Sequence, residues 1–318
     1  MIKATTLCQL FVDENRWNYE QSTIDTFALA WRHFIEAVGN REIDRIEPMD
    51  GEKFKGWIVQ SERSKTSANM WLRAIKRILN WAAAEKGYID ANPLAGTKQM
   101  RITRNPVKFY EDDQVLRMIR FAPTLRWKAI ILCGWTTGLR RGALLNLTQD
   151  NLRGGYVHVE AKRRSERTWS WEPKTKEIRQ VPLVDKLAEW IDRLGCYYPF
   201  LPHRRYFHIL GLQERGVLTP RRRKCPEENF RRSFVAIQRK AFGRQIGDFH
   251  MLRKTYVTNI SSLPEQALMS LSGHKDRRTL TYYTGVRQSM MDDARKIVSD
   301  RVKNGHLLES DTRQRRAL

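Results

Sequence analysis

The sequence lacks the long apolar segment that a membrane-spanning helix requires. No run approaches the roughly 20 apolar residues of such a span, and charged residues make up 29% of the 318-residue chain. The first residues also lack the continuous apolar stretch of a secretory signal peptide. We therefore set membrane insertion aside and expect a globular protein in the cytoplasm.

Cysteine is scarce, and sequence repeats are absent. The four cysteines are widely scattered, and no two have the spacing of two to four residues that is typical of zinc sites. We expect them to be buried structural thiols in a reducing compartment: Cys8, Cys133, Cys196 and Cys225. Without a repeat or a low-complexity segment, we do not expect a solenoid or a disordered-tail architecture.

Acidic residues are too few to balance the basic ones. The chain has 35 Asp and Glu against 58 Lys and Arg, which gives a formal net charge of +23. Residues 1–100 hold 14 basic and 13 acidic side chains, whereas residues 101–318 hold 44 and 22. A field of this sign favours a polyanionic partner, and nearly all of the excess lies after residue 100.

The length allows two domains of about 100–200 residues each. In the first, apolar residues follow helical spacing over 24–38, after Pro48 and over 71–82, and Gly39 and Gly87 mark helix ends. We therefore predict an α-helical domain over residues 1–97. Residues 98–106 have little apolar periodicity and are predicted to be a linker.

The second domain is predicted over residues 107–303, followed by a polar tail over 304–318. Helical patterns are interrupted at Thr136 to Gly138, so Arg140 is expected at the start of a helix. Three segments have strand character: 156–160, 168–171 and 179–183. The predicted fold class is mainly α with a small antiparallel β-sheet.

Three short motifs carry residues suited to chemistry on a phosphodiester. Arg140 follows a glycine break, where a helix start adds partial positive charge, although an ordinary helix-start salt bridge is the alternative. His250 and Arg253 are three residues apart and would share one helix face, as would a purely structural pair. Tyr283 follows His274 by nine residues, although neighbouring tyrosines often serve packing alone.

In this order the motifs resemble the tyrosine recombinase family, the phage-integrase-like site-specific recombinases. The family's boxes are TGLR, a hairpin lysine, HxxR, GH and YT, and the resemblance covers most of the chain. It implies an α-helical core-binding domain followed by a catalytic domain. Lys174 lies eight residues before Pro182, the family's spacing for the hairpin lysine, and Lys176 is the second choice.

The resemblance also implies a role for each residue. Arg140 and Arg253 would bind the non-bridging phosphate oxygens, and Tyr283 would attack phosphorus with His250 assisting its deprotonation. Lys174 would protonate the departing 5′ oxygen, and His274 would hydrogen-bond the phosphate. Tyr283 is preferred to Tyr282 because it has the nine-residue spacing and precedes Thr284.

The implied reaction needs no metal or other cofactor, because arginines take the place of a metal clamp. The implied partner is double-stranded DNA with inverted-repeat core sites, bound by a homotetramer that is monomeric or weakly associated when free. Ala143 departs from the family, which commonly has an acidic residue three positions after the first arginine. Basic residues of the first domain are candidates for contacting DNA phosphates, although a solvated helix face is the alternative: Arg63, Lys65, Arg73, Lys76 and Arg77.

Three other functions remain open. A type IB topoisomerase uses the same chemistry on one duplex. The small helical first domain and the residues of the motifs favour a recombinase. A DNA-binding protein that has lost catalysis would explain the charge and Ala143, but not the retention of Tyr283 and both arginines. A basic RNA-associated protein would leave the ordered motifs to coincidence. We expect a recombinase that mobilises or integrates a genetic element.

Overall fold

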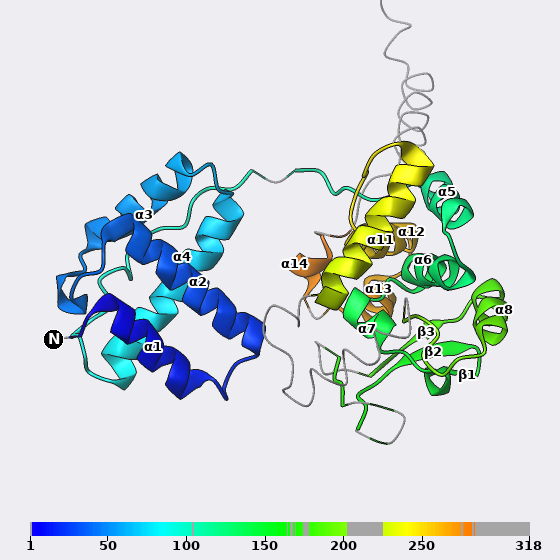
Figure 1. Ribbon diagram of the computed structural model, residues 1–318, viewed down its shortest axis with the longest axis horizontal. Coiled ribbons are helices and arrows are strands. Elements are labelled where there is room, and N and C mark those ends of the chain that lie inside the picture. The colour runs from blue at the N-terminus through cyan, green and yellow to red at the C-terminus, as the bar shows by residue number, and fades with distance from the viewer. Residues whose placement is uncertain are drawn as a thin grey trace, which may run out of the picture. The chain divides into compact units, whose positions relative to one another are not determined.

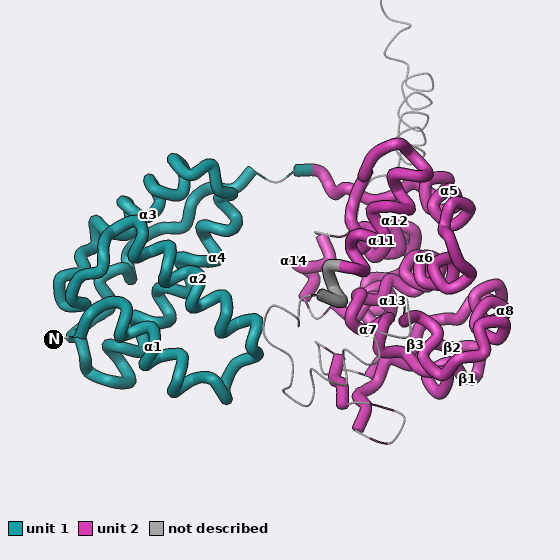
Figure 2. Tube along the Cα trace, in the orientation of Figure 1, with its two compact units in different colours: residues 1–105 teal, residues 106–318 magenta. Residues whose placement is uncertain are grey.

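The structure is a computed structural model. It describes residues 2–103, 105–163, 165, 168, 170–173, 178–201, 225–274, 276–281 and 283, with the side chains of 225–228 excepted. The chain divides into two compact units, Met1–Asn105 and Pro106–Leu318 (Figure 2). Among the described helices, none has the length and apolar content of a membrane span.

Unit 1 is a bundle of α-helices, in which α2 packs against α1, α3 and α4 (Figure 1). The predicted helix ends are confirmed: α2 stops at Gly39, whose φ is 87°, and Pro48 is the first residue of α3. The first helix was not predicted. The elements are α1 (Ala4–Asn15), α2 (Gln21–Val38), η1 (Ile43–Arg45), α3 (Pro48–Gln60), α4 (Lys65–Asn80) and a π-helical turn, η2 (Trp81–Glu85).

Aromatic side chains form much of the core of unit 1. Phe11 meets Phe27 and Trp81 edge to face, with ring centroids 5.0 and 5.3 Å apart. Trp31 is 1% exposed, and its indole N–H donates to the carbonyl of Ala4 over 2.6 Å. This bond ties α1 to α2.

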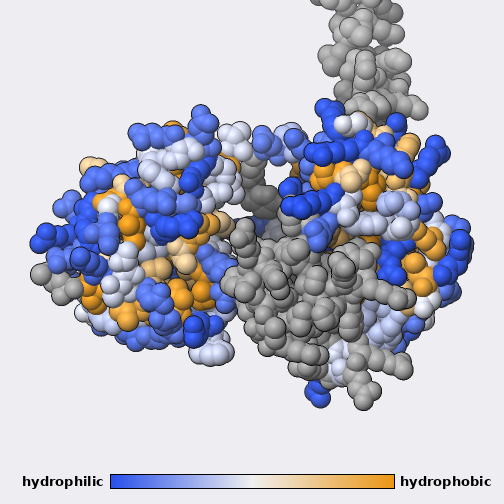
Figure 3. Space-filling model, viewed as in Figure 1, coloured by the Kyte–Doolittle hydropathy of each residue, from blue (hydrophilic) through white to orange (hydrophobic). Residues whose placement is uncertain are grey.

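At the surface, hydrophilic residues predominate on the visible face, with smaller hydrophobic patches between them (Figure 3).

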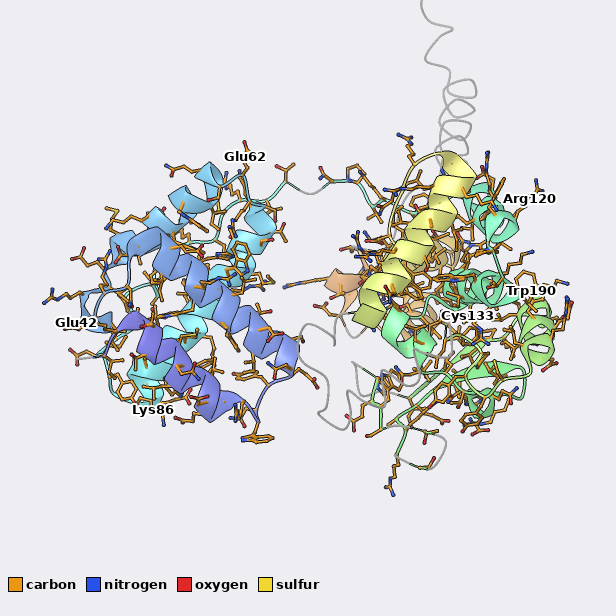
Figure 4. All side chains as sticks on the ribbon, viewed as in Figure 1. Glu42, Glu62, Lys86, Arg120, Cys133 and Trp190 are labelled. Atoms are coloured by element: carbon orange, nitrogen blue, oxygen red, sulfur yellow. The ribbon has the colours of Figure 1, made fainter. Side chains whose placement is uncertain are left out.

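Unit 2 is built around α6 (Leu125–Thr137), which contacts α5 (Asp112–Phe121), α7 (Arg141–Leu145), α8 (Asp185–Leu194) and α12 (His250–Asn259). Ala129 to Gly134 are all buried, which is typical of a helix enclosed on every side. Figure 4 labels Cys133, which is fully buried within this helix. The remaining described helices are η3 (Gln149–Asn151), α11 (Cys225–Phe242), α13 (Glu265–Ser272) and α14 (Arg277–Leu280).

The cysteines follow the sequence prediction only in part. Cys133 is buried as expected, and burial raises the pKa of its thiol to about 12. Cys8 and Cys196 are only half-buried, so the prediction of buried thiols was wrong for these two. The Cys225 side chain lies outside the described residues.

A small antiparallel sheet is confirmed, and two of its strands match the predicted segments 156–160 and 179–183 to within one residue. Its order is β1 (Leu152–Arg153), β2 (Tyr156–Val159) and β3 (Arg179–Pro182). Gly154 and Gly155 have φ values of 61° and 78°, which makes them a tight hairpin turn, so the residues before the turn pair as a strand. The predicted strand 168–171 was wrong: of its described residues, Trp171 forms only an isolated bridge with Lys162.

Candidate active site

Gly138 determines the path of the chain between α6 and α7. It ends α6 in the left-handed region, with φ 58°, and its N–H donates to the carbonyl of Gly134 over 3.2 Å. A Cβ atom at this position would lie 2.3 Å from Cδ1 of Tyr256. Arg140 follows in an extended conformation as the N-cap residue, directly before α7, and it is half-buried. The prediction of a helix start at Arg140 is therefore confirmed.

Arg253 lies on α12 and is 1% exposed. Its Nη1 donates to the carbonyl of Gly138 over 2.7 Å, and its Nη2 donates to the carbonyl of Ser272 over 2.6 Å. Its Nε is buried and has no hydrogen-bond partner in the part of the chain that the structure describes. Burial lowers the pKa of Arg253, and so do the charges of Arg140 and Arg179. The guanidinium group is thus a desolvated cation, and its Nε–H has no hydrogen-bond partner among the described residues.

His274 follows the left-handed Gly273 (φ 66°) that ends α13, and it is 5% exposed. Burial lowers the pKa of its imidazole to about 3, with a further contribution from Arg253, so the ring is neutral near pH 7. Its Nε2 lies 3.1 Å from Nη2 of Arg253, and its Nδ1 lies 2.7 Å from Oγ of Ser272. Because arginine only donates, Nε2 is the acceptor, and Nδ1 carries the hydrogen and donates to Ser272.

His250 and Tyr283 form a direct pair. Nε2 of His250, the first residue of α12, lies 3.0 Å from Oη of Tyr283. The His250 side chain is exposed to solvent, yet the surrounding protein atoms lower its pKa by desolvation, and Arg253 lowers it further. A neutral imidazole can accept the phenolic hydrogen.

The ring of Tyr283 covers the two buried groups of the site. Its centroid lies 5.3 Å from Cζ of Arg253 and 4.4 Å from the ring of His274. Oγ1 of Thr258 donates to the carbonyl of Tyr283 over 3.3 Å, which anchors the tyrosine to the end of α12. The phenol is therefore held over a cation by contacts at both its hydroxyl and its backbone.

The structure brings together five of the six residues predicted for catalysis. Their proximity follows from the contacts above and, for Arg140, from its charge, which lowers the pKa values of His250, Arg253 and His274. These five residues are Arg140, His250, Arg253, His274 and Tyr283. Lys174, its alternative Lys176, and Tyr282 lie outside the described residues.

Arg179 is a member of this cluster that the sequence analysis did not identify. It begins β3, where alternation places it on the same face as the buried Val181. The sequence did contain a signal for Arg179, namely an arginine on the inward face of a predicted strand. Burial and the charge of Arg140 lower the pKa of Arg179 to about 10. Within the described part of the chain, no carboxylate forms an ion pair with Arg140, Arg179 or Arg253.

The five basic residues of unit 1 differ in their surroundings. Nζ of Lys76 donates to the carbonyls of Ala95 and Thr97, and Arg77 contacts Oη of Tyr19 and the carboxylate of Glu85.

The other three are exposed. Arg63 lies over the rings of Trp57 and Trp71 and contacts His33, whereas Lys65 and Arg73 make no such contact with a described residue. A role for any of the five in binding DNA stays a prediction.

Comparisons with known proteins all point to the same family. The profile of the phage integrase family matches residues 108–290. The tyrosine recombinase XerD of Haemophilus ducreyi is 26% identical over 93% of this chain and 98% of its own length. The ICEBs1 integrase of Bacillus subtilis is 23% identical, and its match covers 51% of this chain but only 46% of that protein.

Solved structures show the same fold at low sequence identity. A lambda integrase tetramer bound to a Holliday junction has a TM-score of 0.68 and 16% identity, covering 89% of this chain and 77% of that one. The Tn1549 transposon integrase in complex with a circular intermediate DNA has a TM-score of 0.66 and 17% identity, covering 92% and 99%.

Proposed function

Because the chain belongs to the phage integrase family of tyrosine recombinases, we propose that it breaks and rejoins DNA strands at specific sites through a 3′-phosphotyrosyl intermediate. The observation that carries this proposal is the 3.0 Å contact between Tyr283 Oη and His250 Nε2 beside the buried Arg253. A phenol, a neutral base and arginines that pair with no described carboxylate together suit the transfer of a phosphodiester to tyrosine.

In the cleavage step, Oη of Tyr283 attacks phosphorus, and its proton passes to Nε2 of His250. The lowered pKa of His250 keeps the imidazole neutral and able to accept this proton. The cation of Arg253 near the ring favours the phenolate that forms. The bond between phosphorus and the 5′ oxygen breaks, and the 3′ end of the DNA is left on Tyr283.

Arg140 and Arg253 would stabilise the negative charge that develops on the non-bridging phosphate oxygens. Fixed guanidinium groups in a desolvated site are effective because they need not reorganise during the reaction. Nε of Arg253 has no partner among the described residues, and the ring of Tyr283 lies 5.3 Å from Cζ of the same guanidinium group. We infer that Tyr283 shifts as DNA binds and that Nε then donates to the phosphate.

Lys174 is proposed to protonate the departing 5′ oxygen, with Lys176 as the alternative. This assignment rests on the position of Lys174 in the sequence, eight residues before Pro182. A cation at this point supplies the proton without which an alkoxide leaves slowly.

His274 is proposed to orient Arg253, rather than to contact the phosphate from the start of the reaction. Both of its ring nitrogens have protein partners, Arg253 and Ser272. Direct contact with phosphate would require it to give up one of these bonds.

The proposed partner is double-stranded DNA with inverted-repeat core sites, bound by a tetramer, because strand exchange needs two duplexes and four active sites. Some structural neighbours are integrases bound to core sites or to a Holliday junction, which supports this proposal. The net charge of +23 would draw DNA to the protein. We propose that the reaction mobilises or integrates a genetic element.

The test is to trap the covalent intermediate. The protein is incubated with a pool of nicked duplexes that carry a randomised core, in the presence of a chelator, and adducts are isolated under denaturing conditions and sequenced. We expect an adduct with the natural protein and with Tyr282→Phe, and none with Tyr283→Phe.

Other outcomes would identify other functions. Tight binding of one DNA sequence without any adduct would indicate a DNA-binding protein that has lost catalysis. Relaxation of supercoiled plasmid without pairing of two sites would indicate a topoisomerase. Preferential binding of RNA would contradict the proposal altogether.

A further inference from the structure

Arg179 contacts the segment that carries His274. Its Nη1 donates to the carbonyl of Leu271 over 3.2 Å, across 92 residues of sequence. Its side chain also lies against Gly273, where an added Cβ atom would be 2.7 Å from Nη1. We propose that Arg179 is a positioning residue for the recombination reaction, which holds residues 271–274 so that His274 and Arg253 keep their places. This inference rests on the proposed function.

Two arginines hold consecutive carbonyl groups at the end of α13. Arg179 binds the carbonyl of Leu271, and Arg253 binds the carbonyl of Ser272. The last carbonyls of a helix have no partner within the helix and carry partial negative charge, so cations are favourable there. The turn that leads into His274 is thereby fixed from β3 on one side and from α12 on the other.

The same turn sets the orientation of the His274 ring. Ser272, whose carbonyl Arg253 binds, also accepts a hydrogen bond through Oγ from Nδ1 of His274. A shift of the turn would therefore change the partners of both ring nitrogens. This coupling gives Arg179 an effect on the site without contact with the phosphate.

Arg179 also adds positive charge near Arg253 and His274. Its charge contributes to the lowered pKa of Arg253 and of His274. With Arg140, three guanidinium groups lie close together, and in the described residues no carboxylate is paired with them. Such a cluster favours a bound polyanion.

The first experiment needs no DNA. Long-range ¹H–¹⁵N spectra of histidine-labelled protein report which nitrogen of His274 carries the hydrogen. The natural protein should show a single neutral form protonated on Nδ1. Arg179→Met, which keeps a side chain of similar length but loses the guanidinium, should show a mixture of tautomers. Arg193→Met is the matched control, since Arg193 is 62% exposed on α8 of the same unit.

The second experiment measures single-turnover cleavage of the duplex captured by trapping, together with its dissociation constant. A displacement on the order of 1 Å in a catalytic group can cost about 100-fold in rate. We expect cleavage by Arg179→Met to be slower by roughly 10- to 100-fold, with DNA affinity changed much less, and Arg193→Met to match the natural protein.

The outcomes separate this inference from the proposed function. An unchanged His274 spectrum in Arg179→Met would overturn the positioning role, whatever the cleavage rate. A changed His274 spectrum in Arg179→Met, together with a natural protein that cleaves no DNA, would support the placement of residues 271–274 by Arg179 and contradict the proposed function. If Arg179→Met does not fold, the same measurements are made on Arg179→Lys, where smaller changes in the same directions are expected and identity with the natural protein would overturn the inference.

Discussion

Replacing Gly138 by alanine adds one methyl group at the turn that joins α6 to α7. The added Cβ would lie 2.3 Å from Cδ1 and 2.8 Å from Cγ of Tyr256, whose side chain is 6% exposed and has little room to move. The left-handed conformation costs about 1–2 kcal/mol for a residue with a Cβ, and overpacking a core costs about 1–3 kcal/mol. Unit 2 should therefore lose roughly 2–5 kcal/mol of unfolding free energy.

The matched control is Gly142→Ala, four residues further along. Gly142 lies within α7, and a Cβ atom there would meet nothing within 4 Å. Alanine is favoured over glycine in a helix by about 1 kcal/mol, so this variant should be as stable as the natural protein or slightly more so. The two substitutions make the same chemical change with opposite expected signs.

Thermal unfolding measured by calorimetry tests this prediction. For a unit of this size, the expected loss at Gly138 corresponds to a decrease in Tm of about 4–20 °C. The transition of unit 1 should not move, because the substitution lies in unit 2. Equal stability of the Gly138→Ala and Gly142→Ala proteins would refute the reasoning from positive φ and close contact.

Two further predictions concern protons. The pKa of His274 is lowered to about 3 in the folded protein, so below about pH 6.5 the unfolded chain binds more protons there. Unfolding free energy should therefore fall with decreasing pH by up to about 1.4 kcal/mol per unit, and denaturant titrations from pH 7 to 5 should show a shallower fall for His274→Gln. Lys174→Ala should slow cleavage by about 10²- to 10⁴-fold, and a 5′-bridging sulfur should restore the rate, because a thiolate leaves without protonation. Rescue of Lys176→Ala instead would move the assignment to that lysine.

Features set by local sequence were predictable. Gly39 and Pro48 mark a helix end and a helix start because glycine tolerates positive φ and proline fits the first turn of a helix. The box residues were identified from short motifs at fixed spacings. The sheet was expected, but β1 was missed because a strand of two residues depends on the Gly154–Gly155 turn after it.

Features set by distant contacts were not predictable. Arg179 belongs with the site only because it reaches a carbonyl 92 residues away. Lys76 looked like a residue on an open helix face, yet its amine is bound by two carbonyls about 20 residues further along the chain. The burial of Arg253 likewise depends on Gly138 and Ser272, which periodicity on α12 alone does not reveal.

The contact between Arg253 and the carbonyl of Gly138 bears on how such a site evolves. Gly138 stands two residues before Arg140, so one stretch of main chain receives a hydrogen bond from the second arginine and leads directly into the first. The main chain thus determines how far apart the two guanidinium groups lie. Substitution of neighbouring side chains leaves this main-chain contact in place. Arg140 and Arg253 are therefore linked through the main chain, although residue 143 is alanine and not the acidic residue that is common in the family.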